Sequence, residues 1–302
     1  MPVIEVRNLR KTYRNQVAVE DVSFSVEQGE IFGILGPNGA GKTTTVEIIE
    51  GLRQRDGGTV SVLGLDPRRD AAELRTRIGV QLQQSELPDR LRVIEALELY
   101  ASFYPNPADP EKLLADWNLR DKRRSYFKDL SGGQQQRLFI ALGLIGNPDI
   151  AVLDELTAGL DPQSRRDTWQ LIENLRDSGV TILLVTHFME EAERLCDRLA
   201  IFDAGRVVAL GTPDEIVARL DSSQRIRFRL PAGFDENRLA ALEDVRDVVR
   251  QDDTVVVTGT DNTLNAVSSL LAREQVVVRD LRVEQAGLDD AFVRLTGRTI
   301  GD

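Results

Sequence analysis

The sequence is short of several residue types, and each shortage narrows what the protein can be. Its 302 residues include one cysteine, Cys196, so no disulfide can form within the chain, and this usage is compatible with a reducing compartment. No apolar run approaches the roughly 18 residues that span a bilayer, and the N-terminus shows no basic-then-apolar signal. Acidic residues outnumber basic ones, and the net charge of −11 argues against a nucleic-acid-binding protein. We therefore expect no nucleic-acid partner, and any action on a membrane to pass through another protein.

What is present predicts a soluble α/β protein with two domains. The hydrophobic fraction of 41% and the charged fraction of 29% are those of a globular protein with an ordinary core. Continuous apolar runs at 31–35, 150–153 and 180–185 predict strands buried on both faces. Alternating runs predict further strands at 3–7, 22–26 and 59–63.

The expected secondary structure changes at two points along the chain. From about 86 to 147 it reads as a mostly helical insertion, interrupted by prolines, in a first domain that we place at 1–221. The remainder, 225–302, reads as a small α+β domain with the order β-α-β-β-α-β, which is the ferredoxin-like arrangement.

A glycine-rich stretch with a phosphate-binding pattern follows the first buried strand. It matches G-x-x-x-x-G-K-T, and the strand before it and the helix expected after it are the context that a P-loop requires. Glycines let backbone N–H groups turn toward phosphate oxygens, and a helix N-terminus adds positive charge. Lys42 would reach the β- and γ-phosphates, and the Thr43 hydroxyl would bind Mg²⁺. The predicted nucleotide-binding residues are Gly36, Pro37, Asn38, Gly39, Ala40, Gly41, Lys42, Thr43 and Thr44.

Two carboxylates end the second buried strand. Asp154 is placed to hold Mg²⁺, and Glu155 can act as the general base for an attacking water. A polar cap for the next helix is the alternative, and the P-loop makes it the weaker one.

A second anion site is predicted at Ser131, Gly132, Gly133 and Gln134, which begin an apolar helix. Free N–H groups, a serine hydroxyl and a helix N-terminus gather there. Serine followed three residues later by glutamine is also an ordinary helix cap, although a cap does not need the double glycine.

The stretch 130–137 resembles the signature motif of the ATP-binding cassette (ABC) ATPases, and the resemblance extends over the first 220 residues or so. It implies a P-loop NTPase fold with a RecA-like α/β core, an antiparallel β subdomain and a helical subdomain. It implies that Tyr13 stacks on adenine and that Gln83, beside Gln81 and Gln84, is the Q-loop glutamine that senses Mg²⁺. It also implies that Asp161 belongs to the D-loop at a dimer interface and that His187 contacts the γ-phosphate.

The same resemblance implies a function and an assembly. ATP, with Mg²⁺, would lie between the P-loop of one chain and the signature motif of another, so that a homodimer hydrolyses it. The family commonly has proline at the position of Leu156. The leucine there and the sequence of the run 188–193 resemble those of cassettes that pair with ABC-2 type permeases, including the daunorubicin-resistance type. We expect a cytoplasmic ATPase subunit, peripheral on the inner face of the membrane, that energises a separate permease for export of a drug, lipid, polysaccharide or similar substrate.

Two other functions stay open at this point. One is a soluble ABC ATPase acting on ribosomes or DNA, although that class usually carries tandem cassettes or a coiled-coil insertion. The other is a nucleotide-gated regulatory module, against which the intact Glu155 argues. For the terminal domain we expect bracing of the dimer or regulation.

Overall fold

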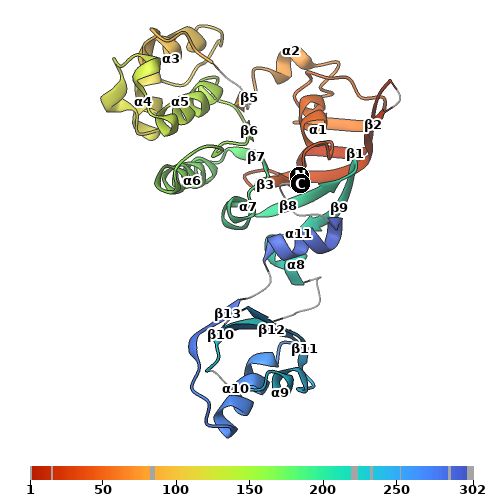
Figure 1. The fold of residues 1–302 in the computed structure, drawn as a ribbon. Helices are drawn as coiled ribbons and strands as arrows, with labels where there is room; N and C mark the ends of the chain where they lie inside the picture. The colour runs from red at the N-terminus through yellow and green to blue at the C-terminus, as the bar shows by residue number, and fades with distance from the viewer. Residues whose placement is uncertain are drawn as a thin grey trace. The chain divides into compact units, whose positions relative to one another are not determined.

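The computed structural model describes residues 2–14, 16–81, 86–218, 224–231, 234–251, 253–284 and 287–297. Its internal packing divides the chain into two compact units, Met1–Pro213 and Asp214–Thr299 (Figure 1). The domain boundary expected after residue 221 stays a prediction. Among the described residues, the helices are all too short or too polar to cross a bilayer.

A nine-stranded mixed sheet forms the centre of the first unit. The strands are β1 (Pro2–Tyr13), β2 (Gln16–Glu27), β3 (Ile31–Leu35), β4 (Gly57–Val62), β5 (Ile78–Gln81), β6 (Ile150–Asp154), β7 (Thr181–Thr186), β8 (Arg198–Asp203) and β9 (Arg206–Gly211). Their order is β4-β1-β2-β9-β8-β3-β7-β6-β5. Strands β4, β1 and β2 pair antiparallel, whereas β8, β3, β7, β6 and β5 run parallel.

Strands β1 and β2 extend beyond the expected 3–7 and 22–26, and their pairing contains several register shifts. A bulge moves the next side chains to the opposite face, so it interrupts the alternation that marks a strand in sequence.

Helices cover the sheet and form a separate helical part beside β5 (Figure 1). The helices of this unit are α1 (Lys42–Ile49), α2 (Ala71–Leu74), α3 (Val93–Ala101), α4 (Pro110–Asp116), α5 (Gly132–Leu144), α6 (Pro162–Asp177) and α7 (Met189–Leu195), with single 3₁₀ turns at Arg120–Lys122 and Phe127–Asp129. The expected helical insertion therefore consists of α3, α4, α5 and the two turns. Helix α5 packs closely on β5, since a Cβ added to Gly79 would lie 2.2 Å from the carbonyl oxygen of Gly143.

The buried parallel strands determine where the functional residues meet. Every residue of β3 and β7 is buried, as the continuous apolar runs predict. Strand β7 pairs with β3 on one side, where Leu35 lies opposite Thr186, and with β6 on the other, where Asp154 lies opposite Val185. The carboxyl ends of β3, β6 and β7 therefore lie side by side at one edge of the sheet.

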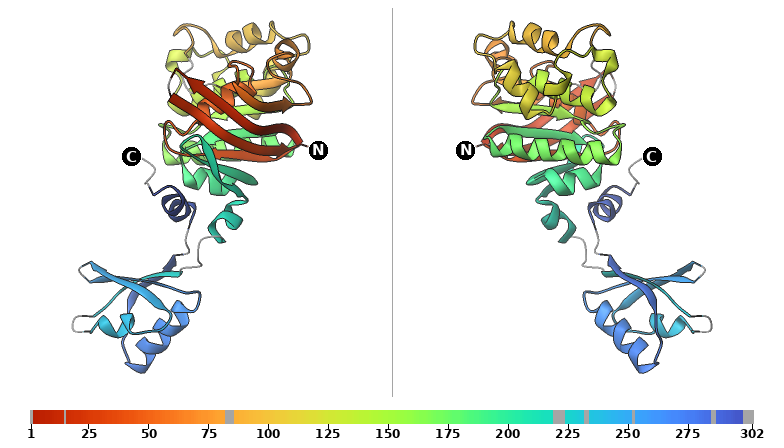
Figure 2. Two further views of the ribbon diagram at one scale, coloured as in Figure 1. Left: turned by 90° about the vertical axis from the view of Figure 1, so that its right-hand side faces the viewer. Right: turned by 90° about the vertical axis from the view of Figure 1, so that its left-hand side faces the viewer.

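The second unit has the predicted ferredoxin-like topology. Its elements are α8 (Pro213–Ala218), which begins at the boundary, and then β10 (Gln224–Arg229), α9 (Asn237–Ala240), β11 (Val245–Gln251), β12 (Thr254–Gly259), α10 (Thr263–Arg273), β13 (Arg279–Glu284) and α11 (Leu288–Thr296). The sheet order is β11-β12-β10-β13, with all pairs antiparallel. Figure 2 shows α9 and α10 on one face of this sheet. Its core includes Ile226, Phe228, Val257 and Leu270, all buried.

Candidate active site

The P-loop makes a tight turn between β3 and α1 that only glycine accommodates at its crowded positions. Gly41 has φ +98°, and a Cβ there would lie 2.6 Å from the carbonyl oxygen of Ala18. A Cβ on Gly36 would lie 2.4 Å from the carbonyl oxygen of Phe202. The hydroxyl of Thr45 donates to the Gly41 carbonyl at 2.9 Å, which fixes the loop to the first turn of α1. The loop is therefore held by its own helix and by neighbouring strands.

Lys42 folds back over this loop. Its side chain is buried in the protein, and Nζ donates to the carbonyl oxygens of Gly36 at 2.6 Å and Pro37 at 3.0 Å. Burial lowers the pKa of Lys42, and the negative charges of Glu155 and Asp154 oppose that effect. The ammonium group thus lies between the loop and the two carboxylates, from where it can reach phosphate oxygens.

Asp154 sits in surroundings that favour a bound cation. Burial, and then the negative charge of Glu155, raise the pKa of Asp154 to about 6, while Lys42 acts in the opposite direction. A carboxylate that is costly to ionise alone gains from a divalent cation beside it. Among the described residues, no group of three or more His, Cys, Asp and Glu side chains is placed to hold a metal. Asp154 and the hydroxyl of Thr43, an exposed residue, fit Mg²⁺, because this ion takes few protein ligands and completes its shell with phosphate oxygens and water.

Glu155 and His187 lie in contact. Oε1 of Glu155 is 3.1 Å from Nδ1 of His187, which directly follows β7. Glu155 has φ +48°, a left-handed conformation that non-glycine residues adopt rarely, and its N–H donates to the Val185 carbonyl at 2.9 Å. Such a conformation is found where a side chain must be aimed, and here it turns the carboxylate toward the histidine. Lys42, Asp154, Glu155 and His187 are thus brought together, as the strand order dictates.

Ser131 to Gln134 lie elsewhere in the same unit. They begin α5, which packs on β5, whereas the P-loop begins α1, on the other side of β6 and β7 in Figure 1. The cap interpretation is realised: the Gln134 N–H donates to Ser131 Oγ at 3.4 Å, and the Ser131 N–H donates to Gln134 Oε1 at 3.0 Å. Ser131 and Gly132 are nevertheless exposed and accessible to another molecule.

The double glycine has a local explanation in part. A Cβ on Gly133 would lie 3.0 Å from Oγ of Ser164, in the first turn of α6, whereas a Cβ on Gly132 would meet nothing. Asp161 caps α6: its carboxylate accepts from the N–H groups of Gln163 and Ser164, and the Ser164 hydroxyl does most to lower the pKa of Asp161. The start of α5 and the Asp161 cap of α6 are therefore neighbours within one chain.

Of the two remaining predicted residues, the structure describes only one. Tyr13 is half-buried at the end of β1, with Lys11 Nζ 5.4 Å and Arg53 Cζ 5.2 Å from its ring centroid. Gln83 lies outside the described residues.

Sequence reasoning missed Glu50, a buried carboxyl at the end of α1. Burial, and then the charges of Asp154 and Glu47, raise its pKa to about 8. The available signal was an acidic residue among the apolar positions of an amphipathic helix, next to Ile48 and Ile49.

Comparison with known proteins identifies the family of the chain. The family model described as ABC transporter matches residues 19–158. The Nod factor export ATP-binding protein I of Ralstonia nicotianae is 38% identical over 100% of this chain and 96% of its own length. The linearmycin resistance ATP-binding protein of Bacillus subtilis is 32% identical over 99% of this chain and 100% of its own. The daunorubicin/doxorubicin resistance ATP-binding protein of Streptomyces peucetius is 35% identical over 99% and 94%.

Solved structures give the same assignment. An ATP-binding subunit of an ABC transporter matches with a TM-score of 0.64 and 31% identity, covering 72% of this chain and 92% of that chain. A dimeric ATP-binding cassette in a post-hydrolysis state, bound to ADP and Pi, matches with a TM-score of 0.62 and 29% identity, covering 69% and 98%. The predicted fold is confirmed, and the chain belongs to the ATP-binding subunits of ABC transporters and is an ATPase of that family.

Proposed function

We propose that the chain energises a separate ABC-2 type permease for export, by hydrolysing ATP at two sites that two copies of the chain share. The separation of Ser131 from the P-loop carries this proposal. One copy brings Lys42, Asp154, Glu155 and His187 together, while its signature residues are exposed elsewhere. A two-fold dimer would let each copy complete the site of the other. The dimeric relative bound to ADP and Pi and the export and resistance relatives support it.

The chemistry assigned to each group follows from its position. The P-loop N–H groups and Lys42 bind the β- and γ-phosphates. Glu155 accepts the proton of a water whose oxygen attacks the γ-phosphorus, and the bond to the ADP oxygen breaks. His187 lies 3.1 Å from Glu155, and it would contact the same phosphate. Asp154 and Thr43 would hold Mg²⁺, which would supply positive charge against the phosphate oxygens. Ser131 to Gln134 of the second copy donate to the γ-phosphate, so that its release loosens the dimer.

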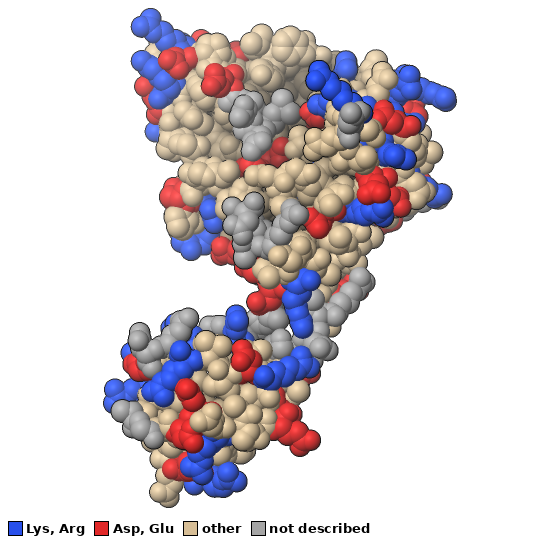
Figure 3. All heavy atoms as spheres, turned by 45° about the vertical axis from the view of Figure 1, so that its right-hand side comes forward, with Lys and Arg blue, Asp and Glu red and all other residues tan. Residues whose placement is uncertain are grey.

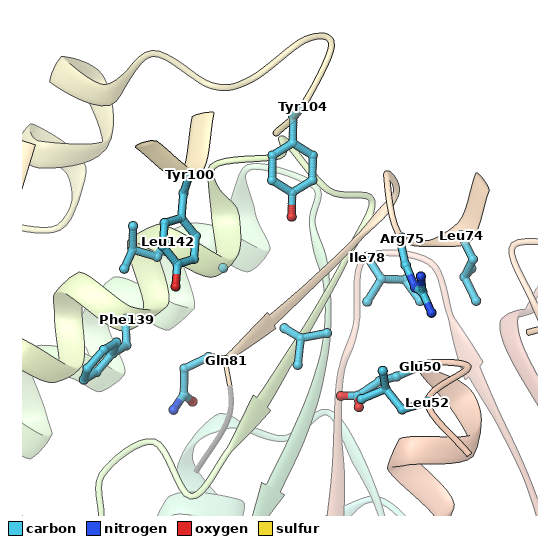
Figure 4. Close-up of a pocket in the computed structure, with 12 residues that line it drawn as sticks. Glu50, Leu52, Leu74, Arg75, Ile78, Gln81, Tyr100, Tyr104, Phe139 and Leu142 are labelled. Carbon is cyan, nitrogen blue, oxygen red and sulfur yellow. The ribbon is translucent and has the colours of Figure 1, made fainter. Parts of the chain in front are cut away.

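A hollow beside β5 offers the permease a docking place. This cavity of about 380 Å³ lies between the end of α1 and the helical part. Figure 4 shows Tyr100 and Tyr104 from the helical side facing Glu50 and Leu52 across it. Glu50 is 7% exposed, and no hydrogen bond or ion pair to its side chain is found within the described ranges. We expect a permease segment to fill the apolar walls and to present a basic or N–H group to the Glu50 carboxyl group.

The cytoplasmic face of the membrane is where such a subunit would work, bound through its permease. Figure 3 shows basic and acidic side chains interspersed over the face it draws, which gives no single basic surface there for a lipid or nucleic acid. The second unit would brace the dimer or regulate it.

Glu155→Gln tests the hydrolytic part of the proposal. The amide keeps the size of the side chain but cannot accept the proton, so ATP should bind, turnover should be lost, and two copies should remain associated. ATP binding, phosphate release and mass by light scattering measure the three effects. A Glu155→Gln protein that hydrolyses ATP at the normal rate would rule out this role. Co-purification of a multi-span protein from membranes tests the permease part.

A further inference from the structure

A buried carboxylate lies behind the loop that carries Glu155. Glu191, on α7, is 0% exposed. Its Oε1 accepts two hydrogen bonds, from the Thr157 hydroxyl at 2.7 Å and from the Trp169 indole N–H at 2.9 Å. Its Oε2 is buried without a hydrogen-bond partner. Burying a carboxyl oxygen without a hydrogen-bond partner destabilises the folded protein, so we expect Glu191 to have a role beyond filling space.

One donor comes from the catalytic loop itself, and the other comes from the helix that follows it. Thr157 is fully buried, two residues after Glu155. Successive turns hold this loop, since the Ala158 N–H donates to the Glu155 carbonyl at 3.1 Å and the Leu160 N–H to the Thr157 carbonyl at 3.2 Å. Trp169 lies on α6, which begins directly after the loop ends at Asp161. Glu191 therefore fixes the loop at its centre and at the helix that follows it.

Glu191 also belongs to the element that carries His187. Helix α7 begins at Met189, two residues after the histidine, and the Ala192 N–H donates to the Phe188 carbonyl at 3.2 Å. The Glu155–His187 contact therefore closes a ring whose other side is the Thr157–Glu191 hydrogen bond. A shift of either element changes both contacts together.

We propose that Glu191 is a positioning residue for ATP hydrolysis: through Thr157 and Trp169 it holds the loop of Glu155 in register with His187. It touches no substrate. The effect falls on the catalytic step, because Lys42 and the P-loop are built on α1 and do not depend on this ring. The inference rests on the proposed roles of Glu155 and His187.

The test compares Glu191→Ala with Glu191→Gln. Alanine removes the acceptor, and kcat should fall about 10- to 100-fold, the scale expected for a misplacement near 1 Å, with KM for ATP and ATP binding within about twofold of wild type. Glutamine keeps an oxygen that can accept both hydrogen bonds, so most of kcat should return. Glu190→Ala, an exposed acid on the same helix, is the matched control and should leave kcat unchanged.

Thr157→Val provides a second route that preserves volume and leaves Glu191 intact. It should lower kcat on its own and add little in the Glu191→Ala background, because both changes remove the same hydrogen bond. Three results would each overturn the inference: full kcat in Glu191→Ala, equal losses of kcat, ATP binding and thermal stability, or full additivity of the two substitutions.

Glu155→Gln, measured in parallel, separates this inference from the proposed function. An inactive Glu155→Gln with a fully active Glu191→Ala removes only the role of Glu191. An active Glu155→Gln excludes Glu155 as the general base, and the positioning role of Glu191 depends on that base.

Discussion

Replacing Glu50 by glutamine should stabilise the nucleotide-free protein, and the gain should grow with pH. Glu50 is 7% exposed, and burial first of all raises its pKa to about 8 from an ordinary value of 4.5. Between these two values the folded protein keeps a proton that the unfolded chain releases, so wild-type stability falls as the pH rises through this window. Glutamine does not titrate and avoids that loss.

The magnitude follows from the same values. Each tenfold change in proton affinity corresponds to about 1.4 kcal/mol. Glu50 should therefore lower the free energy of unfolding of the wild type by about 3 kcal/mol more at pH 8 than at pH 5. For a unit of this size, that difference corresponds to about 6–12 °C in Tm.

Thermal unfolding of both proteins at pH 5, 6, 7 and 8, without nucleotide, measures the effect. Glu98→Gln, an exposed acid on α3, is the control and should show no trend with pH. A Tm difference between Glu50→Gln and wild type that stays constant or shrinks from pH 5 to pH 8 would refute the reasoning.

Two further predictions concern the nucleotide site. Because the pKa of Asp154 is raised to about 6, the apparent Mg²⁺ affinity in the ATPase assay should be constant above about pH 7. Well below about pH 6, where the Asp154 carboxyl is protonated, this affinity should fall about tenfold per pH unit. An affinity that does not change from pH 8 to pH 5 would contradict this prediction. Tyr13→Ala should raise KM for ATP about tenfold, because stacking on adenine is lost, whereas the KM of Tyr13→Phe should stay near that of the wild type. Equal KM values for all three proteins would show that Tyr13 does not belong to the adenine site.

The parts of the fold that could be predicted are those with strong local patterns. Strands β3, β6 and β7 contain continuous apolar runs, and the P-loop and the Asp154–Glu155 pair follow such runs directly. Parallel strands place their carboxyl ends at one edge, so the meeting of Lys42 with Asp154 follows once β3 and β6 share a sheet. The ferredoxin-like unit was predictable because each of its elements is short and bounded by turn residues.

The rest depends on contacts between distant segments. Gly133 matters because Ser164 approaches it from α6, and Glu191 acquires meaning only when Thr157 and Trp169 converge on it. The pKa of Glu50 is set mainly by burial under neighbouring elements, which its own helix does not reveal. The length of β1 was missed because bulges break the alternation of its side chains.

Mixing two inactive variants tests the shared-site account most directly. Lys42→Ala disables phosphate binding by the P-loop and leaves the signature residues intact. Ser131→Arg blocks the signature stretch and leaves the P-loop intact. In a mixed dimer one site combines both defects, and the other combines both intact halves.

Each variant alone should be inactive, and an equal mixture should recover about a quarter of wild-type ATPase activity, since half of random dimers are mixed and each has one intact site. A mixture as inactive as its components, or a Ser131→Arg protein that hydrolyses ATP normally by itself, would contradict the claim that two copies complete each other's sites.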